Sequence, residues 1–79
     1  MNKEEARQIL AESICVNYED CTDSAHLRHD LGADSLSMLS FGVEIADAIG
    51  VKDSDLDPSI YQMEIVGQLL DYVVTAANS

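Results

Sequence analysis

Residues 31–36, Leu31-Gly32-Ala33-Asp34-Ser35-Leu36, join an irregular segment to a long run of helical apolar spacing. Gly32 allows a turn conformation that costs other residues more. Asp34 is a good N-cap, because its carboxylate can accept a hydrogen bond from a backbone N–H group that has no partner within the helix. Ser35 is then in the first turn, where these N–H groups and the helix dipole favour an anion. The stretch therefore predicts a capped helix start that suits a phosphate ester on the Ser35 hydroxyl.

Apolar residues at helical spacing predict two further helices on either side of this one. The N-terminal segment has a stripe that one helix face would bury, formed by Ala6, Ile9, Leu10 and Ile14. Acidic residues near its start, Glu4 and Glu5, complement the helix dipole. The C-terminal segment has a similar stripe, formed by Ile65, Val66, Leu69, Leu70, Val73 and Ala77. Gly67 interrupts that segment and is a mild liability there, of about 1 kcal/mol relative to alanine.

The remaining patterns define a small all-α domain. Asp57 followed by Pro58 predicts the start of a short third helix, with the carboxylate as cap and proline at the first helical position. Residues 17–34 show no sustained period, so they predict a long first loop anchored by isolated apolar side chains, Cys21, Leu27 and Leu31. We therefore predict a single domain over residues 1–79, folded as a four-helix bundle.

Composition excludes several classes of function. The chain has 79 residues with 15 acidic and 4 basic side chains, a formal charge of −11, which repels nucleic acid and anionic membranes. Self-repulsion of this charge should lower the stability at low ionic strength. No apolar stretch approaches the roughly 20 residues of a membrane span. We expect a monomer in the cytoplasm with two reduced cysteines, whose partners carry basic patches.

The helix after Ser35 carries two apolar arcs when its residues are placed at roughly 100° intervals. One arc is wide enough to face a core and contains Met38, Phe41, Gly42, Ile45 and Ile49. The second arc lies beside it and contains Leu36, Leu39, Val43 and Ala46. A polar stripe completes the helix with Ser37, Ser40, Glu44 and Asp47. Either the bundle buries both arcs, or the second arc stays exposed for a partner to bind.

The motif of residues 31–36, the small acidic chain and the order of helices resemble the acyl carrier protein family. The resemblance covers nearly the whole chain and includes the closing Val66-Gly67-Gln68-Leu69-Leu70-Asp71-Tyr72-Val73. In that family the serine of an Asp-Ser-Leu motif bears phosphopantetheine. The resemblance therefore implies that Ser35 is the attachment residue, within a motif completed by Asp34 and Leu36.

The family also implies a mechanism in which the protein itself is not an enzyme. A phosphopantetheinyl transferase would move 4'-phosphopantetheine from coenzyme A onto Ser35, and the terminal thiol would carry acyl groups as thioesters. Acyl-transferring and chain-elongating enzymes with basic docking patches would bind the helix after Ser35. The residues expected to contact these partners are Leu36, Leu39, Ser40, Val43, Glu44 and Asp47. The alternative is an unmodified acidic interaction module that binds partners through the exposed part of the same helix.

Two departures from the family pattern concern the choice of partners. Members that serve fatty acid synthesis usually carry acidic residues two and five positions after the modified serine, where this chain has Ser37 and Ser40. The stretch around residues 51–57 is also slightly long. Both features leave the carrier role intact but argue against the usual partners of fatty acid synthesis. The expected pathway is therefore either fatty acid synthesis or a specialised one, such as polyketide synthesis, lipid modification or a secondary pathway.

Cysteine, histidine and serine patterns do not match established sites. Cys15, Cys21, His26 and His29 have the spacing C-x5-C-x4-H-x2-H, which differs from the usual short cysteine pair and distant histidine pair of zinc sites. A hydrolase with Ser35, His29 and Asp30 or Asp34 lacks the G-x-S-x-G turn. Both histidines are most simply solvated loop residues.

A calcium site of the EF-hand type is disfavoured by one residue. Acidic and hydroxyl side chains occupy positions 1, 3, 5, 7 and 12 of such a loop, namely Asp53, Asp55, Asp57, Ser59 and Glu64, with Ile60 at the usual apolar position 8. Position 6 normally requires glycine for a sharp turn, but here it is Pro58. The sequence therefore predicts no specific metal site, and only weak binding of divalent cations by clustered carboxylates.

Overall fold

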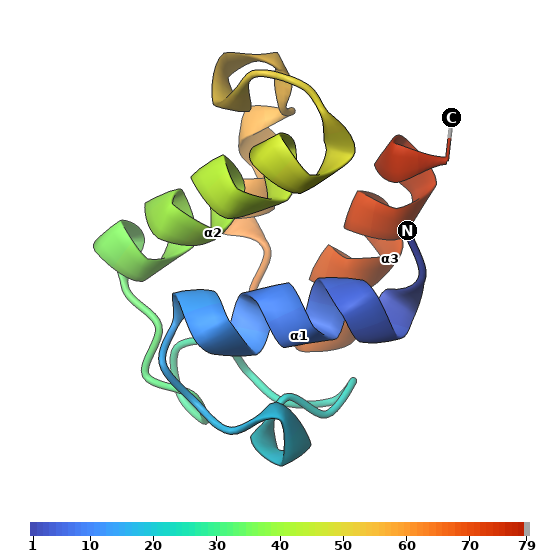
Figure 1. Ribbon diagram of the computed structural model, residues 1–79. Coiled ribbons are helices and arrows are strands. Elements are labelled where there is room, and N and C mark those ends of the chain that lie inside the picture. The colour runs from blue at the N-terminus through green and yellow to red at the C-terminus, as the bar shows by residue number, and fades with distance from the viewer. Residues whose placement is uncertain (79) are drawn as a thin grey trace.

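Three α-helices enclose the core in the computed structural model, which describes residues 1–78 (Figure 1): α1 (Lys3–Ser13), α2 (Ser35–Ile49) and α3 (Val66–Ala77). Short 3-10 helices lie in the connections: η1 (Tyr18–Asp20), η2 (Asp53–Asp55) and η3 (Pro58–Gln62). The predicted all-helical class is confirmed. Figure 1 shows the long first connection running below α1, and the second connection turning back from the C-terminal end of α2.

The predicted third helix begins where expected but is not an α-helix. Asp57 Oδ1 accepts a hydrogen bond from the Ser59 N–H group at 2.9 Å, and Pro58 occupies the first position of η3. The backbone becomes extended at Met63, after only five residues in the 3-10 conformation. Since the next residues pair with the first loop, the segment does not continue as a helix. The count of four α-helices is therefore not supported by residues 1–78, which contain three.

The core is formed by the predicted stripes. From α1 and its C-cap residue it contains Ala6, Leu10 and Ile14, while Ile9 is half-buried at its edge. The largest fully buried side chains come from all three helices and the connections: Phe41, Leu10, Leu27, Ile45, Ile60, Leu69, Leu70, Val66 and Cys21. The expected loop anchors Cys21 and Leu27 are buried, and Leu31 is half-buried. The first loop is thus part of the core.

Backbone hydrogen bonds attach the first loop to the start of α3. The Leu27 N–H group donates to the Glu64 carbonyl at 2.7 Å, next to an isolated antiparallel bridge between His26 and Ile65. The N-cap residue of α3, Ile65, makes no side-chain capping bond. Instead, the first N–H groups of α3 are satisfied by loop carbonyls, with bonds of 3.0 Å from Val66 to Ala25 and 2.9 Å from Gly67 to Asp23. The loop therefore caps this helix, a role that usually falls to a side chain.

Gly67 is a requirement of this capping, which corrects its interpretation as a liability. A Cβ atom at this position would lie 2.9 Å from the Asp23 carbonyl oxygen and 3.2 Å from the Asp23 Cβ. Real Cβ atoms do not approach a backbone oxygen so closely, so a side chain here would force the loop away from α3. The absence of a side chain lets the Gly67 N–H group reach its acceptor.

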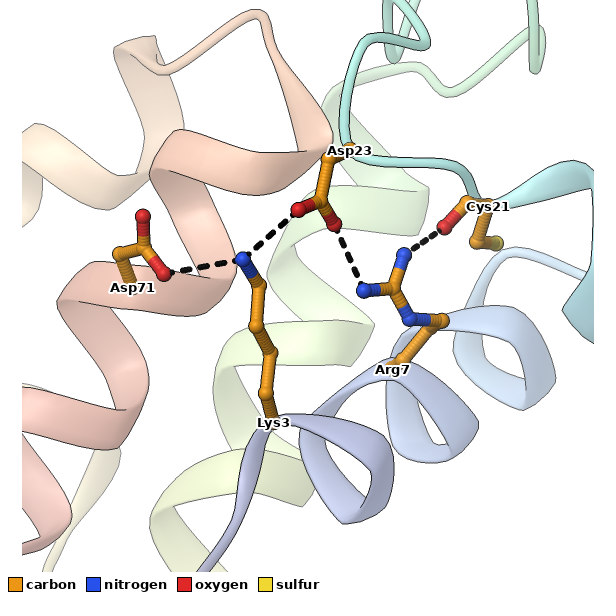
Figure 2. A network of polar contacts seen from close by, with 5 residues as sticks. All are labelled: Lys3, Arg7, Cys21, Asp23 and Asp71. Carbon is orange, nitrogen blue, oxygen red and sulfur yellow. Dashed lines mark hydrogen bonds and ion pairs between the residues drawn. The ribbon is translucent and has the colours of Figure 1, made fainter.

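Side chains of α1 hold the same part of the loop, and one of them also pairs with α3 (Figure 2). Lys3 Nζ lies 2.9 Å from Asp23 Oδ2 and 3.1 Å from Asp71 Oδ1. Arg7 Nη2 lies 2.6 Å from Asp23 Oδ1, and its Nη1 donates to the Cys21 carbonyl. The pKa of the Asp23 carboxyl lies below its ordinary value of 3.8, because Lys3 and Arg7 donate hydrogen bonds to it, and the bond from Lys3 has the largest effect. Asp23 thus joins the loop to α1 by its side chain and to α3 by its carbonyl.

Replacement of Gly67 by alanine tests the docking of the loop. A helical Gly→Ala change usually stabilises, by about 1 kcal/mol. Here we expect Gly67→Ala to lower the free energy of unfolding by about 1–3 kcal/mol, because the new methyl group overpacks the contact with Asp23. Urea unfolding followed by circular dichroism measures the change, and Gln68→Ala on the exposed face of α3 is the matched control. Stabilisation by Gly67→Ala would contradict the described contact.

Neutralisation of Asp23 tests the polar network. A depressed carboxyl pKa contributes stability that is complete above the ordinary value of 3.8 and is lost as the pH falls through the lower folded-state value. We expect Asp23→Asn to lower Tm at pH 7, and the difference from the wild type to shrink toward pH 3. Glu19→Gln removes one negative charge from the same loop and is the control, since relief of self-repulsion alone should leave Tm unchanged or raise it. Equal effects of the two variants would argue against the network.

Candidate functional site

The predicted helix start is confirmed at α2. Gly32 adopts a positive φ of 70°, which places the turn in a conformation that favours glycine. Asp34 is the N-cap residue, and its Oδ1 accepts a hydrogen bond from the Ser37 N–H group at 2.8 Å. The backbone N–H group of Ser37, with its hydroxyl, holds the pKa of the Asp34 carboxyl below its ordinary value. Asp34 is therefore ionised at neutral pH and fixes the first turn of α2.

Ser35 is the first residue of α2, and its side chain is exposed. Ala33, two residues before Ser35, is buried, and its N–H group donates a hydrogen bond to the Leu27 carbonyl at 2.8 Å. The chain on the C-terminal side is equally fixed by the cap on Ser37. An accessible hydroxyl thus lies between two anchored positions, where an enzyme can approach it without any rearrangement of the backbone.

The two apolar arcs of α2 have different environments. Met38, Phe41, Gly42 and Ile45 are buried as predicted, and Ile49 is half-buried. In the second arc, Leu36 is 77% exposed, Leu39 50% and Val43 54%. Ala46 was placed in that arc but is buried, since its small side chain lies at the border with the core. The alternative in which both arcs are buried is therefore wrong for the three large side chains.

These three side chains, Leu36, Leu39 and Val43, form an exposed apolar strip along α2 that begins beside Ser35. Val51, which the sequence analysis did not assign to any surface, is 42% exposed. It lies beyond the C-terminal end of α2, in the wall of a surface depression of about 260 Å³ that also includes Val43 and Asp47. Its place in a connection without helical periodicity explains why the pattern did not identify it.

The polar residues expected at the same surface are exposed but not equivalent. Ser40 and Asp47 are exposed on α2. Glu44 is also exposed, yet its Oε2 accepts a hydrogen bond of 2.6 Å from the Ser13 hydroxyl at the end of α1. This carboxylate thus bridges two helices, a contact between residues far apart in sequence that no local pattern predicts.

The side chains considered for zinc occupy different environments. Cys15 is exposed and Cys21 is buried, and burial raises the pKa of the Cys21 thiol, which disfavours the thiolate that zinc requires. The rings of His26 and His29 are tilted against each other at 44°, with centroids 4.2 Å apart. No group of three or more potential metal-binding side chains of His, Cys, Asp or Glu is found within residues 1–78.

The residues considered for an EF-hand or a hydrolase site make contacts other than those that such sites require. The Asp57 carboxylate of the EF-hand alternative caps η3. For the hydrolase alternative, Asp30 Oδ2 accepts a hydrogen bond from the His26 backbone, and Asp34 accepts one from the α2 backbone. His26 is half-buried, so its assignment as a solvated loop residue was wrong, whereas His29 is exposed.

Within the described residues, no helix is both long and apolar enough to cross a membrane.

Comparisons with known proteins identify the family. The family model for a phosphopantetheine attachment site matches residues 4–73. The acyl carrier protein of Thermotoga maritima is 31% identical over 67 residues, which represent 85% of this chain and 80% of the relative. The acyl carrier protein of Saccharopolyspora erythraea is 34% identical over 70 residues, or 86% of this chain and 70% of the relative.

The match spans the capped start of α2, the exposed strip and the docked loop. The chain belongs to the acyl carrier protein family, and it is a carrier of acyl groups on covalently attached 4'-phosphopantetheine.

Proposed function

We propose that Ser35 bears the prosthetic group and that α2 presents it to partner enzymes. The observation that carries this proposal is an exposed hydroxyl at the first residue of α2, held between the buried Ala33 and the Asp34 cap. The residues fit a phosphodiester on Ser35, because its charge would lie at the positive end of the helix dipole. Asp34 already accepts the Ser37 N–H group, so the ester is expected to extend into solvent.

This chain supplies positioning and no catalytic group. The bound arm supplies a terminal thiol that holds acyl groups as thioesters. In the attachment step the Ser35 oxygen loses its proton and forms the new bond to the phosphorus next to the pantetheine of coenzyme A. The pyrophosphate P–O bond breaks at the same phosphorus, adenosine 3',5'-bisphosphate leaves, and the transferase provides the acid–base chemistry. A carrier docked on an enzyme confines its cargo near the active site, which raises the effective concentration of the substrate.

The exposed apolar strip is the proposed docking surface. Its residues Leu36, Leu39 and Val43 are at least half exposed and lie on the helix that begins with Ser35. The exposed side chains of Ser40 and Asp47 border the strip, and the chain as a whole carries a charge of −11. Such a surface suits a partner with apolar side chains surrounded by basic residues, which accelerate the encounter. Glu44 belongs to the same polar stripe, although its contact with Ser13 limits its reach.

The cognate synthase is proposed to differ from a general fatty acid synthase. Serine at positions 37 and 40 leaves the first half of the docking helix without an acidic residue. We place the protein in the cytoplasm as a monomer that serves a specialised lipid or polyketide pathway. An unmodified interaction module, the second candidate, would use the same strip but would need no reactive Ser35.

Incubation with coenzyme A and a phosphopantetheinyl transferase of broad specificity tests the attachment residue. We expect the intact mass to rise by one prosthetic group, because a single exposed hydroxyl occupies the start of α2. The Ser35→Ala variant should stay unmodified and fully helical, and Ser37→Ala is the matched control that should still be modified. If several such transferases leave the wild-type mass unchanged, the unmodified interaction module becomes the better explanation.

Substitutions on α2 test the docking surface with the modified protein and a ketosynthase of fatty acid synthesis. Leu39→Asp should lower kcat/KM at least about tenfold, since truncation of a central interface residue commonly costs 1–2 kcal/mol or more. Ser40→Glu should raise kcat/KM, mainly through faster association at low salt. Gln68→Glu, an exposed change in α3, controls for the added charge. Unfolding of Leu39→Asp in circular dichroism, or equal effects of the two glutamates, would contradict this assignment.

A further inference from the structure

The imidazole of His26 accepts two backbone hydrogen bonds within its own turn. The Arg28 N–H group donates to His26 Nδ1 at 3.2 Å, and the His29 N–H group donates to the same atom at 3.1 Å. A ring nitrogen that accepts hydrogen bonds carries no proton, so we assign the ring hydrogen to Nε2. This nitrogen lies 3.3 Å from Glu64 Oε2, to which it then donates. The described contacts therefore require the neutral form of the ring.

The backbone of the same residue completes a reciprocal arrangement. The His26 N–H group donates to Asp30 Oδ2 at 2.7 Å. The His26 carbonyl in turn accepts from the Asp30 and Leu31 N–H groups, at 2.9 and 3.2 Å. This pattern has the logic of a helix capping box, in which a side chain at the start of the turn and one further along each satisfy the other's backbone. Here the acceptor at the start is an imidazole nitrogen.

The turn that His26 closes leads directly to Ser35. Within it, the Gly32 N–H group donates to the Arg28 carbonyl at 3.2 Å, and the Ala33 N–H group donates to the Leu27 carbonyl at 2.8 Å. Ala33 is buried, and Asp34 follows it as the cap of α2. Loss of the two bonds to His26 Nδ1 would therefore loosen the segment that sets the position of the Ser35 backbone.

A second proton on the ring removes the acceptor. Protonated Nδ1 would be a donor that faces two other donors, the N–H groups of Arg28 and His29. The titratable groups in contact with His26 are the carboxylates of Glu64 and Asp30 and the tilted ring of His29. Glu64 already accepts from Nε2 when the ring is neutral, so its attraction to a charged ring does not replace the lost bonds.

We propose that neutral His26 is a positioning residue for the modification and presentation of Ser35, and that acidification releases the turn before α2. This inference rests on the proposed attachment at Ser35. It assigns to His26 a role as acceptor, and it predicts a carrier whose attachment loop is ordered while the ring is neutral and loosened when the ring gains a second proton.

Two substitutions of His26 distinguish the loss of its hydrogen-bond acceptor from the loss of its ring. In His26→Asn the side-chain oxygen can accept from N–H groups two and three residues ahead and does not titrate. In His26→Ala the acceptor is lost. At pH 7.5 we expect Ala33 amide exchange to become about 5- to 30-fold faster in His26→Ala and to stay near the wild-type rate in His26→Asn. The kcat/KM of phosphopantetheine transfer should fall several-fold in His26→Ala alone.

Exchange at two pH values tests the protonation step. After correction for intrinsic exchange, protection of the Ala33 amide should be lower at pH 5.5 than at pH 7.5 in the wild type and in Glu64→Gln, but not in His26→Asn. The same pH response in His26→Asn, or unchanged Ala33 exchange in His26→Ala, would overturn the proposal. So would faster exchange in His26→Ala with an unchanged rate of transfer, because positioning would then be irrelevant.

The design keeps the two proposals distinguishable. If the wild type is not modified at Ser35, the proposed attachment fails, while amide exchange still reports on the turn. If His26→Ala does not fold, the wild type and His26→Asn at two pH values still supply the comparison.

Discussion

The docking of residues 23–27 against the start of α3 is the contact on which the rest of the structure depends. Backbone carbonyls of this segment accept the first N–H groups of α3, and its own Leu27 N–H group reaches back to Glu64. Side chains reinforce the contact, since Asp23 pairs with cations of α1 while its carbonyl meets Gly67. One segment thus caps a helix, completes the core with Leu27 and leads into the turn before Ser35.

The charged side chains fall into two groups: a few stabilise the fold through ion pairs, and most contribute to the negative charge of the surface. Two of the four basic side chains, Lys3 and Arg7, are held in the network around Asp23. Within residues 1–78, most carboxylate side chains make no ion pair, and the chain carries a formal charge of −11, which is a suitable field for attracting a basic partner. The exposed apolar side chains of α2, Leu36, Leu39 and Val43, are uncharged, so the proposed docking surface combines an apolar strip with the acidic field of the rest of the chain.

Local patterns predicted what depends on neighbours in sequence. Asp34 as a cap, Asp57 with Pro58 as a helix start, and the buried arc that contains Phe41 all follow from spacing within one or two turns. Contacts between distant segments were not predictable in this way. Every residue has a backbone carbonyl, so the sequence does not show that the Asp23 carbonyl meets Gly67. Without this contact, Gly67 looks like a residue that only weakens the helix. The role of His26 and the bond between Ser13 and Glu44 likewise require knowledge of which segments meet.

The cap of α3 has a consequence for the order of folding. Its acceptors, Asp23 and Ala25, are separated from Gly67 and Val66 by roughly 40 residues, so the cap forms only after a large loop has closed. α1 can complete its own capping box with Asn2 and Glu5, and α2 has its cap in Asp34. We therefore expect α3 to consolidate late and together with the loop, so that the correctly presented Ser35 is a product of the final step of folding.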